Sequence, residues 1–145
     1  MDLRKLVITL VTLATFAKAV NGGCCGNLEL TLENDASANQ GLRAGNYEIQ
    51  AETVNGRNVW KRDDGKYVMW FNSDTGYWTI GSSLGSGGGI FAPSQFECPN
   101  EVGSQWSYYK VGSFNTIIDA GNDVSVKCAG KKQLSKYNRV NTLNL

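Results

Sequence analysis

The sequence contains no histidine. Without an imidazole, the Ser-His-Asp and Cys-His arrangements of nucleophilic catalysis are excluded. The cysteines include no Cys-x-x-Cys pair, so a zinc site is also disfavoured. The calcium-loop pattern D-x-[DN]-x-[DN]-G is absent, and no spacing of carboxylates nominates an acid/base pair. We therefore predict that the protein is not an enzyme and has no catalytic residues, no bound metal and no cofactor.

A strong net charge is also missing. Outside residues 1–19, eleven basic and twelve acidic side chains remain, which gives a net charge of −1. We therefore expect no nucleic-acid partner. Residues 131–145 form a basic tail that contains no acidic residue. This tail either offsets an acidic body or binds anionic glycans or membranes. The sequence also lacks an Asn-x-Ser/Thr sequon, so we expect no N-glycosylation of the chain itself.

Residues 1–19 have the composition of a secretory signal peptide. Arg4 and Lys5 precede the apolar run LVITLVTLATFA, residues 6–17, and an Ala-Lys-Ala sequence ends at Ala19. A membrane anchor is the alternative, but twelve helical residues span about 18 Å, whereas the hydrocarbon core is about 30 Å thick. We predict cleavage at Ala19 or a few residues later, secretion to the extracellular space and no stable membrane insertion.

The rest of the chain is the size of one domain. We predict a secreted β domain over residues 20–130, followed by the basic tail. Four cysteines, Cys24, Cys25, Cys98 and Cys128, lie in this domain, and an even number in an exported protein predicts two disulfides. A bridge between the adjacent Cys24 and Cys25 would be strained, so two pairings remain open. Each bridge is expected to stabilise the fold by about 2–5 kcal/mol.

Alternation of apolar and polar residues predicts short β-strands along the domain. Residues 46–54 and 57–62 are strand-like runs separated by Asn55-Gly56, which predicts a hairpin with a type I′ turn. The run KYVMWF, residues 66–71, is apolar on both faces and predicts a central strand covered on both sides. The serine- and glycine-rich residues 82–89 predict a flexible loop.

No window of eleven residues in the predicted mature chain keeps a helical spacing uninterrupted by glycine or β-branched residues. The fold class predicted is therefore all-β. We expect a single compact antiparallel sandwich or barrel of about seven to nine short strands, held by disulfides. The last strand, which ends at Cys128, is expected to lie near the first.

The tripeptide Asn55-Gly56-Arg57 has two interpretations. The favoured one is the turn that a hairpin requires, because both central residues of a type I′ turn need positive φ. The alternative is an exposed adhesion motif. Substitution of Gly56 by alanine separates the two, since a turn role predicts lost stability and an adhesive role predicts a folded protein that no longer holds cells.

A set of glycine, aromatic and cysteine motifs is spread over residues 45–128: Gly45-x-Tyr47, Asn55-Gly56-Arg57-x-x-Trp60, Trp78-x-Ile80-Gly81, Cys98-Pro99 and Trp106-x-Tyr108. Together they resemble a small secreted β-rich module that recurs, alone or in tandem, in extracellular proteins of invertebrates and protists. The resemblance implies a β-rich fold and an extracellular location. It implies no activity.

Aromatic residues on the predicted strands are the candidates for ligand binding. Alternation places Trp106 and Tyr108 on one face of a strand, and separates Tyr77 from Trp78 on another. We nominate Tyr77, Trp106 and Tyr108, with Asp74 in the adjacent turn, because aromatic faces beside polar groups suit a sugar or a protein hot spot. The alternative is that most of these aromatic residues belong to the core.

These patterns predict a secreted, non-catalytic, lectin-like binding module for extracellular glycans, glycoconjugates or protein surfaces. One alternative is a structural protein of an extracellular or mineralised matrix. A weaker alternative is a membrane-active toxin or defence protein that uses the basic tail. The sequence leaves the oligomeric state open.

Overall fold

The computed structural model describes residues 23–93, 95–113 and 115–130. The predicted signal peptide, residues 1–19, and the predicted basic tail, residues 131–145, lie outside the described residues. Within the part of the chain that the structure describes, no helix is both long and apolar enough to span a membrane.

Nine strands form one antiparallel sheet in the described residues. The strands run in the spatial order β8-β7-β6-β5-β4-β3-β2-β1-β9, so the chain meanders from β1 to β8 and then returns to pair β9 with β1. Their bounds are β1 Asn27–Leu32, β2 Gly45–Val54, β3 Arg57–Arg62, β4 Val68–Asn72, β5 Tyr77–Gly81, β6 Ile90–Pro93, β7 Ser107–Tyr109, β8 Ile117–Asp119 and β9 Val124–Cys128.

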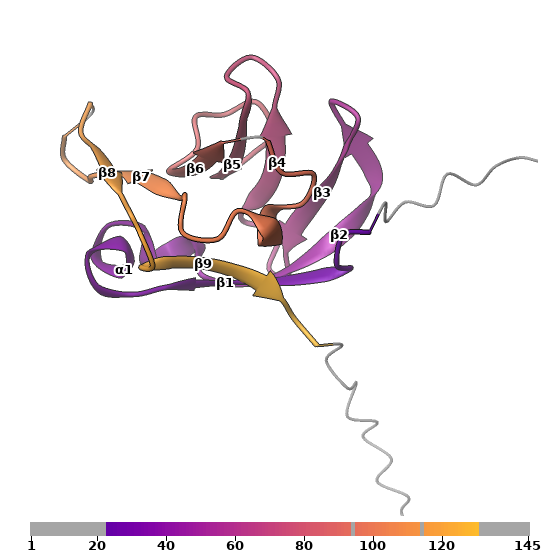
Figure 1. The fold of residues 1–145 in the computed structure, drawn as a ribbon, viewed down its shortest axis with the longest axis horizontal. Coiled ribbons are helices and arrows are strands. Elements are labelled where there is room, and N and C mark those ends of the chain that lie inside the picture. The colour runs from indigo at the N-terminus through magenta and orange to yellow at the C-terminus, as the bar shows by residue number, and fades with distance from the viewer. Residues whose placement is uncertain (1–22, 94, 114, 131–145) are drawn as a thin grey trace, which may run out of the picture.

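The sheet curls into a half-barrel whose two edges are β8 and β9 (Figure 1). This curl follows from the twist of adjacent strands, which accumulates over so many of them. The structure confirms the predicted all-β antiparallel fold. It also confirms that the last strand lies beside the first, since Leu28 pairs with Cys128 and Leu32 pairs with Val124.

The concave face of the sheet is filled with large side chains. Three of the four tryptophans lie here, together with tyrosines and aliphatic residues, and all are almost completely buried: Tyr47, Trp60, Trp78, Trp106, Tyr108, Leu28, Leu30, Met69, Ile80 and Ile90. Trp60 and Trp78 meet edge to face, with ring centroids 5.9 Å apart. Such pairs add about 0.5–1.5 kcal/mol beyond the burial of their area. This cluster is the main core.

Strand β4 is buried on both of its faces, as the apolar run predicts. Met69 joins the main core, whereas Val68 and Trp70 pack with Val59 in a second, smaller cluster. Because successive side chains of a strand point to opposite faces, the second cluster lies on the convex side of the sheet. The convex face therefore carries apolar packing of its own.

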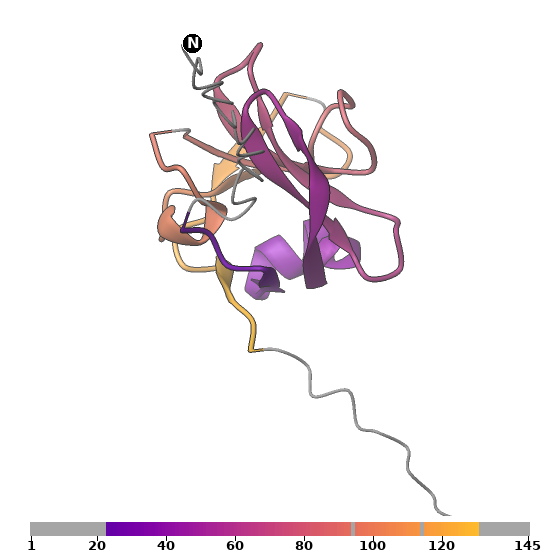
Figure 2. The same ribbon diagram turned by 90° about the vertical axis from the view of Figure 1, so that its right-hand side faces the viewer.

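The helix α1, Asn34–Gln40, is a feature that the periodicity analysis missed. It has seven residues, fewer than the window used to detect helical spacing, and is followed by the 3-10 helix η1, Gly41–Arg43. A second 3-10 helix, η2, spans Pro99–Glu101. The helix α1 lies beneath the curled sheet in Figure 2 and packs against β1 and β7. Its residues Ala36 and Gln40 are buried.

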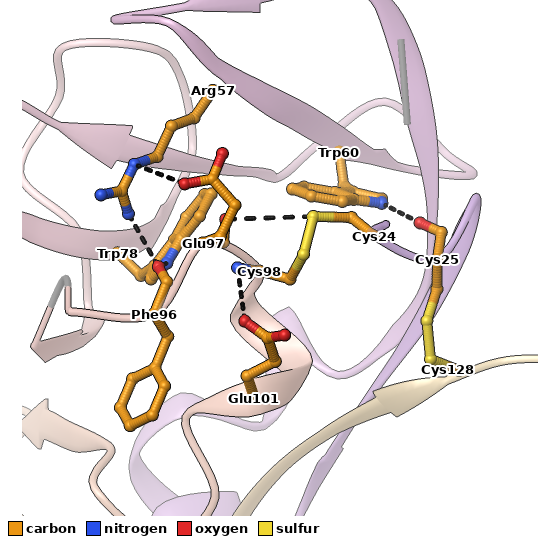
Figure 3. Close-up of a disulfide and its surroundings, with 10 residues drawn as sticks. All are labelled: Cys24, Cys25, Arg57, Trp60, Trp78, Phe96, Glu97, Cys98, Glu101 and Cys128. Atoms are coloured by element: carbon orange, nitrogen blue, oxygen red, sulfur yellow. Dashed lines mark hydrogen bonds and ion pairs between the residues drawn. A yellow bond between two sulfur atoms is a disulfide. The ribbon is translucent and has the colours of Figure 1, made fainter. Parts of the chain in front are cut away.

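Two disulfides join Cys24 to Cys98 and Cys25 to Cys128 (Figure 3). The structure thus confirms the two predicted bridges and selects one of the two pairings left open. The first bridge ties the segment before β1 to the segment before η2, and the second ties the segment before β1 to the end of β9. Trp60 from β3 supports this junction, because its Nε1 donates a hydrogen bond of 3.0 Å to the carbonyl oxygen of Cys25.

The Asn55-Gly56 pair forms the β2–β3 hairpin turn, with φ of 52° and 75°. Positive φ at both positions is what a type I′ turn requires, so the turn prediction is confirmed. Arg57 folds back over the sheet, with its guanidinium carbon 3.9 Å from the ring centroid of Phe71. Its Nη1 also donates a hydrogen bond of 2.8 Å to the carbonyl oxygen of Phe96 (Figure 3). Arg57 is thus part of the packing, which disfavours a displayed adhesion motif.

Candidate functional site

The structure separates the sequence-predicted site residues. Trp106 and Tyr108 are fully buried in the main core, so neither can meet a ligand at the surface. Tyr77 is 41% exposed on the convex face. Asp74 is exposed in the β4–β5 turn, where its backbone N–H donates to Oδ1 of Asn72.

The assignment of Trp106 and Tyr108 to a surface site requires a correction. Alternation determines which residues share a face of a strand, but it does not determine which face points inward. In β7 the face with Tyr108 turns into the half-barrel, and Tyr109 turns outward with 38% of its surface exposed. Sequence reasoning therefore missed Tyr109, and the same alternation could have identified it if the direction of the curl had been known.

Three aromatic side chains form a stripe across the convex face. Tyr77 comes from β5, Phe91 from β6 and Tyr109 from β7. The ring centroids of Tyr77 and Phe91 are 5.8 Å apart, and those of Phe91 and Tyr109 are 5.1 Å apart. We call these three residues the aromatic stripe.

The register of the strands explains why the stripe is continuous. Phe91 lies opposite Thr79 and Ser107, so its ring reaches Tyr77 and Tyr109 along the diagonals of the antiparallel ladder. Diagonal neighbours lie within reach of aromatic side chains. The sequence thus places one outward ring on each of three consecutive strands, and pairing brings the three rings into line.

A groove of about 240 Å³ runs along the stripe. Its remaining lining is polar or small, apart from one apolar residue at the β8 edge: Asn72, Thr75, Thr79, Gly87, Gly88 and Ile117. Hydroxyl and amide groups beside aromatic rings can accept and donate hydrogen bonds while the rings contact an apolar surface. Asn72 at the end of β4 and Thr75 in the β4–β5 turn line the groove, whereas Asp74 does not.

The glycine-rich segment Ser82–Gly89 forms one wall of this groove. Its end is anchored on both sides, because the N–H of Gly89 donates to Ile80 and its carbonyl accepts from the N–H of Tyr109, each at 3.0 Å. Gly88 packs so closely on β5 that an added Cβ would lie 2.1 Å from Cγ2 of Thr79. The segment expected to be a flexible loop is therefore held against the sheet at its Gly88-Gly89 end.

A second groove, of about 630 Å³, lies over β2, β3 and β4. Its lining is aliphatic and polar and contains no aromatic ring: Gln50, Ala51, Glu52, Val54, Val59, Lys61, Gly65, Val68, Ser82, Ser83 and Leu84. Ligand sites are typically lined by aromatic and apolar side chains with a few placed polar groups, and the smaller groove has this lining whereas the larger one has no aromatic ring. The aromatic stripe is therefore the better candidate for a site.

The groove along the stripe offers binding groups rather than acid/base groups. None of the described residues that line it is a carboxylate, a lysine or an arginine. In the acidic turn after β3, a hydrogen bond from Arg62 lowers the pKa of Asp64 to about 2. The carboxylate of Asp64 is therefore ionised and forms an ion pair with Arg62. Within the described ranges, no three His, Cys, Asp or Glu residues are grouped as metal ligands.

Comparisons of the chain with protein-family models, curated proteins and solved structures gave no significant match.

Proposed function

We propose that the protein is a secreted, non-catalytic module that binds glycans on the aromatic stripe. The observation that supports this most strongly is the row of three outward rings on β5, β6 and β7, bordered by the hydroxyl group of Thr75 and the amide group of Asn72. A sugar has an apolar face formed by its C–H groups and a rim of hydroxyls, so a row of rings with polar neighbours matches both parts.

The rigid setting of the stripe also favours binding. The three rings stand on paired strands, and the anchored end of Ser82–Gly89 fixes one wall of the groove. A surface that is already ordered loses little conformational entropy when a ligand binds. The two disulfides are compatible with an oxidising, extracellular location, which the predicted signal peptide would provide.

A soluble-glycan array tests this function. The variants are Tyr77→Ala and Tyr109→Ala, and the matched control is Leu42→Ala, because Leu42 is an exposed apolar residue of η1 that does not line the groove. We expect wild type and the control to bind the same glycans. Each stripe variant is expected to lose at least about tenfold in affinity, which corresponds to about 1.4 kcal/mol.

The alternative of a matrix structural protein has one observation in its favour. The sheet has an open edge at β8, where Ile117 is 54% exposed. Open edges and apolar side chains beside them promote self-association. Sedimentation at increasing concentration distinguishes the two functions, because assembly without glycan binding favours a matrix role and defined glycan binding by a monomer favours recognition. Leakage of liposomes would instead support the membrane-active alternative.

A further inference from the structure

A second pocket adjoins the groove of the aromatic stripe. It has a volume of about 540 Å³ and shares Gly87, Gly88 and Tyr109 with that groove. Its other polar side chains are Gln40, Arg43, Lys110 and Ser113. We call it the arginine pocket. The two pockets therefore meet along these three residues, so a ligand lying on the stripe is next to the arginine pocket.

The fold positions the guanidinium of Arg43 in this pocket. Gln40, which is only 4% exposed, accepts a hydrogen bond of 2.5 Å from Nη1 of Arg43 and donates one of 2.6 Å to the carbonyl oxygen of Tyr109. The guanidinium carbon lies 5.3 Å from the ring centroid of Tyr67. A Cβ at Gly89 would lie 2.6 Å from that carbon, so the approach of the loop to Arg43 requires glycine.

The charge of Arg43 lacks a counter-charge among the described residues. Its Nε is buried and has no hydrogen-bond partner there, and the ion pairs formed by these residues do not include it. Arginine stays protonated at any physiological pH, so it cannot relieve this cost by losing its proton. Burying a charged group without a counter-charge is unfavourable, and an anionic ligand that supplies the counter-charge gains the difference.

The residues around the arginine pocket add to its positive charge. Lys110 is a second, exposed cation on its rim, and no carboxylate lines it among the described residues. The described residues as a whole contain twelve acidic and seven basic side chains. A locally cationic pocket on an acidic body is an electrostatic feature that selects anions.

We propose that the arginine pocket binds an anionic substituent, a sulfate or a carboxylate, of the glycan whose ring stacks on the aromatic stripe. The ligand is then an acidic oligosaccharide. The guanidinium suits such a group because its planar N–H donors match the oxygens of a carboxylate or sulfate, and Lys110 adds a point charge. This inference rests on the proposed function and narrows it to one class of glycan.

The test uses neutral and acidic versions of the same sugars. Cellotetraose and chitotetraose are each titrated against the intact protein unmodified, carrying one O-sulfate and carrying one uronate. We expect the acidic versions of at least one sugar to bind at least about tenfold more tightly. A preference for sulfate over uronate, or the reverse, identifies the anionic group.

The matched variants are Lys110→Gln and Lys127→Gln, since Lys110 lines the pocket and Lys127 is an exposed lysine on β9. We expect Lys110→Gln to weaken binding of the acidic sugars several-fold and to leave the neutral ones unchanged, and Lys127→Gln to change neither. Equal affinity for neutral and acidic versions would overturn the inference and leave the proposed function standing. Absence of binding to every sugar tested would overturn both.

A second measurement does not depend on a substitution that could disturb folding. In an NMR titration with sodium sulfate, the Nε–H resonance of Arg43 is expected to shift and saturate, because an oxyanion bound to the guanidinium changes the electrostatic environment of this N–H. Sodium chloride at matched ionic strength should produce no saturable shift. The same response to both salts would contradict a specific oxyanion site.

Discussion

Removal of the Cys25–Cys128 disulfide is expected to lower the free energy of unfolding by less than the number of residues between the two cysteines suggests. The two cysteines are 103 residues apart, and the chain-entropy relation gives about 4.7 kcal/mol for such a loop. However, the Cys24–Cys98 bridge shortens the connection. The path from Cys25 to Cys24, across to Cys98 and on to Cys128 contains only about 33 residues, for which the same relation gives about 3.7 kcal/mol.

The assay is equilibrium urea unfolding of wild type and of the double variant Cys25→Ser with Cys128→Ser. The partner variant, Cys24→Ala with Cys98→Ala, closes the same path and should lose the same entropic term, although its separation in sequence is 74 rather than 103. It should lose more in total, because Cys24 and Cys98 are buried in the main core and Cys128 is exposed. A larger loss for the Cys25–Cys128 variant, or a loss below about 1 kcal/mol for either, would refute this reasoning.

Three further predictions concern the β2–β3 hairpin and the main core. Gly56→Ala should lower the free energy of unfolding by about 1 kcal/mol, because alanine is strained at the positive φ of this turn. The control Gly26→Ala should not, because an added Cβ meets no atom within 4 Å at either position and only Gly56 has a positive φ. Equal losses in urea unfolding would contradict this prediction. Arg57→Ala should lower the free energy of unfolding by about 2–3 kcal/mol in the same assay, because it removes a charged hydrogen bond and a cation–π contact. A loss under about 0.5 kcal/mol would show that Arg57 is not part of the packing. Burial raises the pKa of Tyr47, so wild type should lose stability above about pH 10, where a tyrosine in the unfolded chain ionises. The variant Tyr47→Phe should lose less stability over the same pH range. Identical pH profiles of the two urea midpoints would show that ionisation of Tyr47 does not cause the loss.

Local sequence features predicted the parts of the fold that depend on local geometry. The Asn55-Gly56 turn follows from the φ values that a tight hairpin demands, and the two-sided burial of β4 follows from an apolar run that no single face can hide. The pairing of the first and last strands was also predictable, because adjacent cysteines at one end must reach partners far along the chain.

Other features depend on how the sheet curls, which no local pattern determines. Trp106 and Tyr108 share a face, as predicted, but the curl turns that face into the core and exposes Tyr109. The disulfide pairing was equally inaccessible, because both remaining pairings close loops of similar length. The helix α1 is held by buried Ala36 and Gln40 in only seven residues, which is too short for a periodicity to be detected.

The position of Arg43 shows a further limit of sequence analysis. Its pocket is built by Gln40 from α1, by Gly89 after β5 and by Tyr109 from β7. These residues are separated by as many as 69 positions, so nothing in the sequence around Arg43 marks it as a candidate. Only the packing of α1 beneath the sheet brings the guanidinium beside the aromatic stripe.

The most direct test of glycan recognition on the convex face is an NMR map of ring-proton shifts on addition of the best oligosaccharide from the array. We predict that the aromatic protons of Tyr77, Phe91 and Tyr109 shift together along one titration curve, while those of the buried Trp106 and Tyr108 change little. Saturable shifts confined to another face of the domain, or no saturable shift with any sugar tested, would contradict it.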